Sequence, residues 1–226
     1  MFAILKKEFK TYFVTPVGYI FITIFLLMLS ATFYLYTYLQ GSTRLEYVVL
    51  DSSVILTFII PLLTTRMFSE EKKSGTDQLL NTSPKSIVSI VLGKFFAATL
   101  VICVTVLFFL VYYFILKHFG PVSLIEPLVG LFGFLLLAMS YIAFGMFISA
   151  LTSNLVLAAI IPMAFNFGLM FLYSNFKLLP LISLVSMFQK FPQGVISLKE
   201  LIGFLSFILL FVLLTILVLQ RRKSVK

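Results

Sequence analysis

Long stretches without a charged residue alternate with short charged stretches along this chain. Residues 11–43, 95–116 and 201–220 carry no charge, and residues 127–176 form an uncharged stretch of fifty residues. A helix needs about 20 apolar residues to cross the hydrocarbon core, so the longest stretch is expected to supply two spans. The stretches are apolar throughout and do not alternate in short segments as membrane β-barrel strands do. Because backbone groups in lipid must pair within their own segment, the pattern predicts helices.

One further span is less clean, since only fourteen uncharged residues separate Asp51 from Arg66. That is too short for a membrane helix, so we expect the helix to begin near Tyr47, with Asp51 at the outer headgroups. The predicted fold class is therefore all-α integral membrane, with six transmembrane helices. They are expected at residues 17–39, 47–66, 86–116, 127–150, 155–175 and 199–220.

Composition and charge agree with a membrane protein. Hydrophobic residues make up 61% of the 226 residues and charged residues 11%, whereas a soluble domain carries roughly 25% charged residues. Twelve Lys and Arg residues lie on the side of the two termini and the loop after the second predicted helix, and five lie on the other side. By the positive-inside rule, both termini and that loop are expected in the cytoplasm. No basic face stands apart from this pattern, so no nucleic-acid partner is expected.

Residues 1–15 have the pattern of an amphipathic helix. The apolar set is Phe2, Leu5, Phe9, Tyr12 and Phe13, and the charged set on the other faces is Lys6, Lys7, Glu8 and Lys10. Such a helix lies in the membrane interface with its lysines toward anionic headgroups, which makes membrane lipids an expected partner. Thr15-Pro16 is expected to end this helix, because the residue before a proline disfavours helical geometry.

The densest charge lies at residues 66–85, the predicted cytoplasmic loop between the second and third membrane helices. Eight of the chain's 25 charged residues fall between Arg66 and Lys94. Residues 66–73 favour a helix and are expected to extend the second membrane helix beyond the headgroups. Ser74-Gly75 is expected to end it, since glycine suits the left-handed position that follows a helix.

The second half of this loop is expected to hold a short helix of its own. Thr76 suits the N-cap of a helix at residues 77–81, with Asp77 at its positive end. Ser83-Pro84 is a second start signal, from which the third membrane helix is expected to rise. Leu79 and Leu80 then have no core of their own, which indicates a contact with another protein.

Residues 176–198 form an apolar segment on the predicted outer side. Pro180, Pro192 and Gly194 interrupt it, yet it is too apolar for an ordinary exposed loop. Two short helices that dip into the outer leaflet fit this pattern, because irregular backbone at membrane depth needs protein around it. We therefore expect a re-entrant segment here.

The sequence lacks the residue sets that catalysis or metal binding requires, so no catalytic and no metal-binding residues are expected. Gly93-Lys94 resembles the end of a P-loop, but Val88 and Phe95 occupy the positions of its first glycine and its hydroxyl residue. The chain is therefore expected to bind no ATP itself. No ionisable residue is expected firmly inside a span, which argues against an ion-coupled transporter.

Neutral polar and small residues inside the predicted spans have two interpretations. Asn166, which follows Pro162, either forms an interhelical hydrogen bond or lines a substrate path. Gly145 and Ser149 lie one helical turn apart, so they are expected to pack either two helices or a dimer interface closely together.

The charged loop carries a resemblance to a known family. Residues 68–84, followed by Ile90-Val91-Leu92-Gly93-Lys94, resemble the loop between the second and third helices of ABC type-2 permeases. The short six-helix permeases of the gliding-motility and nitrous-oxide-reductase-maturation type are the most similar subgroup. The order of predicted elements resembles this family over the whole chain, as a single transmembrane permease domain at residues 1–226.

The resemblance implies partners and site residues. It implies a dimer with a second permease copy or paralogue, and cytoplasmic ABC ATPase subunits that bind ATP and Mg, while this chain binds no cofactor. It implies that the loop carries a coupling helix, with Leu79 and Leu80 as apolar contacts for the ATPase. The implied coupling residues are Glu70, Glu71, Lys72, Ser74, Gly75, Thr76, Asp77, Leu79, Leu80 and Ser83.

The resemblance also implies a function and a location. It indicates the permease subunit of an ATP-binding cassette transporter, an exporter, in a bacterial or archaeal cell (inner) membrane, with the outer segment gating the exit. The alternative is an ATP-independent structural or assembly protein or a passive channel, in which the charged loop is a solvated anchor.

Overall fold

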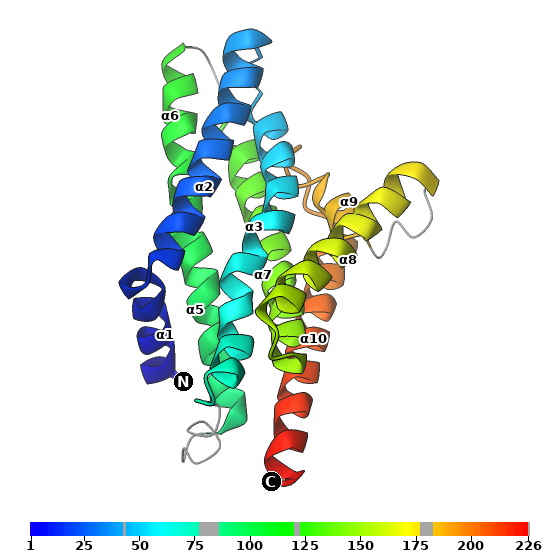
Figure 1. Cartoon of the computed structure of the whole chain (residues 1–226). Coiled ribbons are helices and arrows are strands. Elements are labelled where there is room, and N and C mark those ends of the chain that lie inside the picture. Colours follow the sequence, from blue (N-terminus) through cyan, green and yellow to red (C-terminus); the bar gives the residue numbers. More distant parts are fainter. Residues whose placement is uncertain (43, 77–85, 120–122, 177–182, 226) are drawn as a thin grey trace.

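The computed structural model describes residues 1–42, 44–76, 86–119, 123–176 and 183–225. Within these residues the chain is built from helices (Figure 1). They are α1 (Phe2–Val14), α2 (Pro16–Phe33), the π-helical turn η1 (Tyr34–Leu39), α3 (Leu45–Lys73), α5 (Ile87–Leu107), α6 (Phe109–Phe119), α7 (Ile125–Leu151), α8 (Leu155–Phe176), α9 (Leu184–Phe188) and α10 (Leu198–Val225).

The described residues contain six helices that are long and apolar enough to cross a membrane. They are Pro16–Leu39, Leu45–Lys73, Ile87–His118, Ile125–Leu151, Leu155–Leu172 and Leu198–Arg222. The six predicted spans are therefore confirmed. Helix α3 begins at Leu45, slightly before the predicted start at Tyr47.

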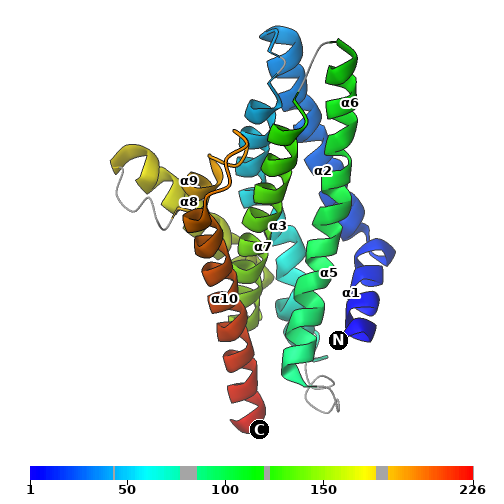
Figure 2. The same ribbon diagram turned by 180° about the vertical axis from the view of Figure 1, so that it is seen from behind.

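Helices α3 and α7 form the centre of the bundle. In their most apolar windows, 67% of α3 and 72% of α7 is buried, against 17% of α8. The other long helices surround this pair, and α8 leans away from the bundle toward one end (Figures 1 and 2). Central helices hold the small residues that close packing needs, while the outer ones carry large apolar side chains on their free faces.

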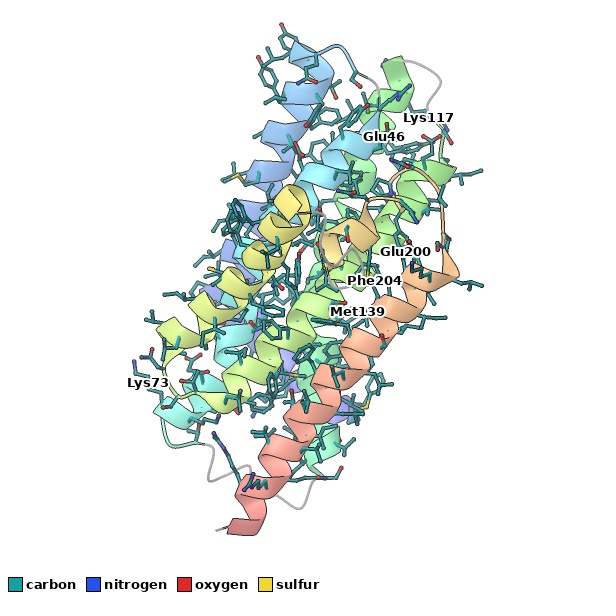
Figure 3. All side chains as sticks on the ribbon, turned by 90° about the vertical axis from the view of Figure 1, so that its right-hand side faces the viewer. Glu46, Lys73, Lys117, Met139, Glu200 and Phe204 are labelled. Carbon is teal, nitrogen blue, oxygen red and sulfur yellow. The ribbon has the colours of Figure 1, made fainter. Side chains whose placement is uncertain are left out.

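Both chain ends lie at the same end of the bundle, as an even number of spans requires (Figure 1). Figure 3 places Lys73 at that end and Glu46 and Lys117 at the opposite end. Charged groups thus cluster at the two ends of the bundle, with apolar side chains between them. We call the end with the two termini the inner end; its cytoplasmic location stays a prediction.

The apolar segment before α10 folds back onto the bundle. Phe188 at the end of α9 and Phe191 in the following turn are completely buried, and α9 lies below the outer ends of α2 and α6 (Figure 1). A Cβ added at Gly133 of α7 would lie 2.4 Å from the Phe191 ring, so a glycine is needed for this contact. Where two short helices were predicted, the described residues show α9 and a turn; residues 177–182 lie outside the described part.

Candidate functional site

The candidate site is the inner end of α3. As predicted, residues 66–73 continue this helix beyond its apolar part. Arg66 and Glu70 lie one turn apart and form an ion pair, in which Arg66 Nη2 donates to Glu70 Oε1 at 2.9 Å. The pair supports the helix on its solvent side, where neighbours at i and i+4 face each other.

The predicted helix end at Ser74-Gly75 is confirmed. Ser74 is the C-cap, and Gly75 adopts a φ of 72°, a left-handed conformation that glycine tolerates without steric cost. Side-chain hydroxyls satisfy the last carbonyls, because Ser74 Oγ donates to Glu70 O at 2.9 Å and Thr76 Oγ1 donates to Glu71 O at 3.2 Å. The chain thus leaves α3 in a fixed direction just before the part of the loop that the structure does not describe.

Helix α7 is bonded to this end of α3 through Ser149. The hydroxyl of Ser149 accepts from the backbone N–H of Phe68 at 3.1 Å and of Ser69 at 3.0 Å, and it donates to Thr65 O at 3.2 Å. Ser69 Oγ in turn donates to the Ser149 carbonyl at 3.0 Å. Gly145, one turn earlier on α7, lies against Thr64. The Gly145 and Ser149 pair therefore packs α7 against α3 within one chain.

Lysine 72 extends this contact to the last turn of α7. Its Nζ donates to the carbonyl of Ala150, one of the terminal carbonyls that no helical N–H satisfies. A cation near the C-terminus of a helix also interacts favourably with the helix dipole. The resemblance implied Lys72 as a coupling residue, and the structure shows that it joins α3 to α7.

Lysine 94 joins three helices at the same level. It lies on the second turn of α5 with 2% of its surface exposed. Its Nζ is 2.7 Å from Glu71 Oε1 on α3 and 3.3 Å from Glu8 Oε2 on α1, and it lies 5.3 Å from the centre of the Phe68 ring. An ammonium has three donors, and here two face carboxylates and one side faces an aromatic ring. We call Glu8, Glu71 and Lys94 the charge triad.

Two sequence-based expectations fail at the triad. Lys94 was counted as a loop charge and no ionisable residue was expected inside a span, yet Lys94 lies within the apolar helix Ile87–His118 and is buried. Glu8 was assigned to the polar face of α1, yet it lies between the buried Ile4 and Tyr12 on the face that packs inward. The spacing of four residues from Ile4 to Glu8 to Tyr12 was the available signal.

Helix α1 docks through this face. A Cβ at Gly93 of α5 would lie 2.8 Å from Ile4 Cγ2, which shows how closely the two helices approach. The Tyr12 hydroxyl donates to the backbone carbonyl of Leu63 on α3 at 3.2 Å. Burial raises the pKa of Tyr12, and the nearby Glu8 charge acts in the same direction, so the hydroxyl stays protonated as a donor. The location of α1 in the membrane interface stays a prediction.

A cavity of about 260 Å³ lies beside the triad. Residues of α1, of the inner end of α3 and Lys94 line it, with both charged groups and hydroxyls among them. The second oxygen of Glu71, Oε2, is buried without a hydrogen-bond partner among the described residues. The inner end therefore combines tight ion pairs with free volume.

The remaining predicted site residues fall into two groups. Asp77, Leu79, Leu80 and Ser83 lie outside the described residues, so the predicted coupling helix stays a prediction. Asn166 lies far along the chain on α8, is 5% exposed, and its Oδ1 has no hydrogen-bond partner in the part of the chain that the structure describes.

Comparison with protein families decides the class of this bundle. The profile of the ABC-2 family transporter proteins matches residues 42–219. The chain belongs to the ABC-2 transporter family. The match runs from just before α3 to the last turns of α10 and so includes five of the six spans, the charged loop and the α9 segment. No curated protein matches the chain.

Membership defines the role of this ABC-2 permease in outline. It is the membrane permease of an ABC transporter, a multi-pass membrane protein, and not itself the ATPase. The family implies association with an ABC ATPase. The residues that join α3 to α1, α5 and α7 are thus parts of the membrane permease of an ABC transporter.

Proposed function

We propose that this permease is an exporter subunit, driven by a separate cytoplasmic ATPase that binds the loop at residues 66–85. One observation supports the proposal most: the helix that enters this loop is bonded directly to three other helices. Glu71 contacts Lys94 on α5, Leu63 accepts a hydrogen bond from Tyr12 on α1, and Ser69 contacts Ser149 on α7. A displacement of the loop would therefore act on the helix bundle and not on the loop alone.

In the proposed mechanism, ATP binding closes the ATPase dimer and shifts the loop. The rigid inner end of α3 carries the shift into α7, the helix that packs most extensively in the bundle centre. At the other end of α7, Gly133 contacts Phe191, so the same helix supports the outer segment that we propose as the exit gate. The α3 and α7 pair thus forms a continuous mechanical path from the ATPase to the gate.

We also propose a dimer and a substrate path. Helices α2 and α8 bury only 22% and 17% of their most apolar windows within one chain, which leaves apolar faces for a second permease copy and for lipid. Asn166 is the proposed polar group of the path, because its buried carbonyl oxygen lacks a partner among the described residues. An unpaired amide oxygen in an apolar bundle is costly to keep, which favours a role with a ligand.

The coupling proposal is tested by changing the loop leucines. The chain is tagged, purified from native membranes with its ATPase, and compared with the variant Leu79→Asp/Leu80→Asp. We expect the variant to lose the ATPase on purification, because two charges would enter a proposed apolar contact. Ser153→Asp is the matched control, since Ser153 is exposed in the α7–α8 turn at the same end of the bundle. Equal recovery of the ATPase with the double variant and the control would refute the proposal.

A further inference from the structure

The charge triad connects α1 and α5 to the inner end of α3. Helix α1 packs principally on α5 and reaches α3 through side chains, whereas α3 packs extensively on α7. Figures 1 and 2 both show α1 beside the inner half of α5. Helix α5 itself packs on α7, so α1 is joined to the α3 and α7 pair both through α5 and through its own side chains. Lys94 lies where α1, α3 and α5 meet.

Three contacts of polar or cation–π type reach the inner end of α3 from α1 and α5. They are the Lys94 to Glu71 pair at 2.7 Å, the Lys94 to Phe68 ring contact at 5.3 Å, and the Tyr12 to Leu63 hydrogen bond at 3.2 Å. Between α1 and α5, by contrast, Ile4 fits closely against Gly93. Directional ion pairs can keep two elements aligned while both move, but they are lost when one partner is removed.

The balance of charge makes Lys94 central to the triad. Two carboxylates share the Lys94 ammonium, so its removal leaves both without this contact, while Lys7 and Arg66 remain in the lining of the adjoining cavity. The Glu71 side chain is 23% exposed and that of Glu8 is 18% exposed, so water solvates them only in part. The adjoining cavity gives both carboxylates room to separate, which would release α1 from α3.

We propose that Lys94 is a positioning residue that ties α1 to the inner end of α3, so that α1 moves with α3 when the ATPase displaces the loop. This inference rests on the proposed function, because the ATPase supplies the displacement. Without the Lys94 ammonium, the displacement of the loop would still reach α3, while α1 would keep its position on α5. Through Lys94, the ATP-driven displacement of α3 thus also moves α1, the predicted interfacial helix.

The first test measures docking in the purified permease without nucleotide, by hydrogen exchange of the α1 amides. We expect Lys94→Met to raise exchange in residues 4–14 about tenfold or more, because loss of one partner of a buried pair strongly destabilises the contact. The triple variant Lys94→Met/Glu8→Gln/Glu71→Gln removes all three charges at nearly the same shape and is expected to return exchange to within about threefold of wild type. Lys10→Met is the matched control, since Lys10 is exposed on the same helix. Wild-type exchange in Lys94→Met would overturn the proposal.

The second test separates alignment from stability, using the complex with its ATPase. Hydrogen exchange is followed in residues 2–14 and 66–76, with and without trapping by ATP and vanadate. In the wild type we expect trapping to change exchange in both segments. In the neutral triple variant, we expect a change in residues 66–76 and none in residues 2–14, because the fold is kept but the ionic tie is absent.

Two other outcomes of the second test would refute different proposals. Equal changes in residues 2–14 in the wild type and the triple variant would overturn the role of Lys94, while leaving the coupling proposal intact. An absence of any change in residues 66–76 of the wild type would instead refute the proposed coupling itself. The two failures are therefore distinguishable in one experiment.

Discussion

The contact between Gly145 and Thr64 allows a quantitative test of the bundle centre. A Cβ added at Gly145 would lie 2.4 Å from Thr64 Oγ1, 2.9 Å from its Cβ and 3.0 Å from its Cγ2. Thr64 is completely buried and β-branched, so its side chain has few alternative rotamers in a helix. Gly145→Ala therefore forces α3 and α7 apart at this close contact.

Two opposing effects set the size of the change. Overpacking of a buried site costs about 1–3 kcal/mol, and the rigid neighbour favours the upper half of that range. Replacement of a helical glycine by alanine returns about 0.5–1 kcal/mol. The net destabilisation is then about 1–2.5 kcal/mol, or a fall of about 2–10 °C in Tm for a chain of this length.

Gly168→Ala is the matched control, because no atom lies within 4 Å of a Cβ at Gly168 on α8. Gly168→Ala keeps the stabilising effect of alanine in a helix and introduces no steric clash, so its Tm should equal or exceed that of wild type. The chain has ten Tyr and no Trp, so unfolding of the detergent-purified protein is followed by Tyr fluorescence. Adding Thr64→Ala should recover at least half of the loss in Gly145→Ala. If Gly145→Ala unfolds at or above the temperature of Gly168→Ala, the close contact is wrong.

Three further predictions concern the two ends of the bundle. Gly133→Ala should displace the Phe191 ring and raise hydrogen exchange in residues 183–198, and unchanged exchange would contradict the packing described for this segment. Ser149→Ala should remove the hydroxyl that bonds to the Phe68 and Ser69 N–H groups and to Thr65 O, and cost about 1–3 kcal/mol, seen as faster exchange at residues 66–72 and absent in the control Ser153→Ala. Because the pKa of Tyr12 is raised in the folded state, its stabilising contribution is complete below the unfolded pKa of about 10 and is lost as pH rises above it. The Tm of wild type should therefore fall more between pH of about 9 and about 11 than that of Tyr12→Phe, and equal falls would contradict a buried Tyr12 donor.

Much of the inner end was predictable from local signals. Residues 66–73 had helix-forming composition, and Ser74-Gly75 carried a stop signal that the φ of 72° at Gly75 confirms. The six spans followed from the lengths of the uncharged stretches, because the hydrocarbon core sets a minimum length for any crossing helix. Such signals depend on neighbours in the sequence and need no knowledge of packing.

The partners of the charged residues were not predictable in the same way. Charge alone placed Lys94 with the loop and Glu8 with the solvated face of α1. A buried lysine and a surface lysine look identical in a sequence, and only the approach of α1, α3 and α5 distinguishes them. Likewise, Lys72 differs from Lys73 only because the last turn of α7 lies within reach of its side chain.

The sequence by itself determined that this chain is a helical membrane protein, how many helices cross the membrane, and where the charged loop begins. Those properties follow from hydrophobic length and local turn chemistry, which act along the chain. Only the tertiary structure decided that the inner end of α3 is held by Ser149 and by the charge triad, since these contacts join residues as far apart in the sequence as Glu8 and Lys94. Whether a charged side chain is exposed to solvent or buried in an ion pair between helices depends on which helices surround it, and that is a property of the fold.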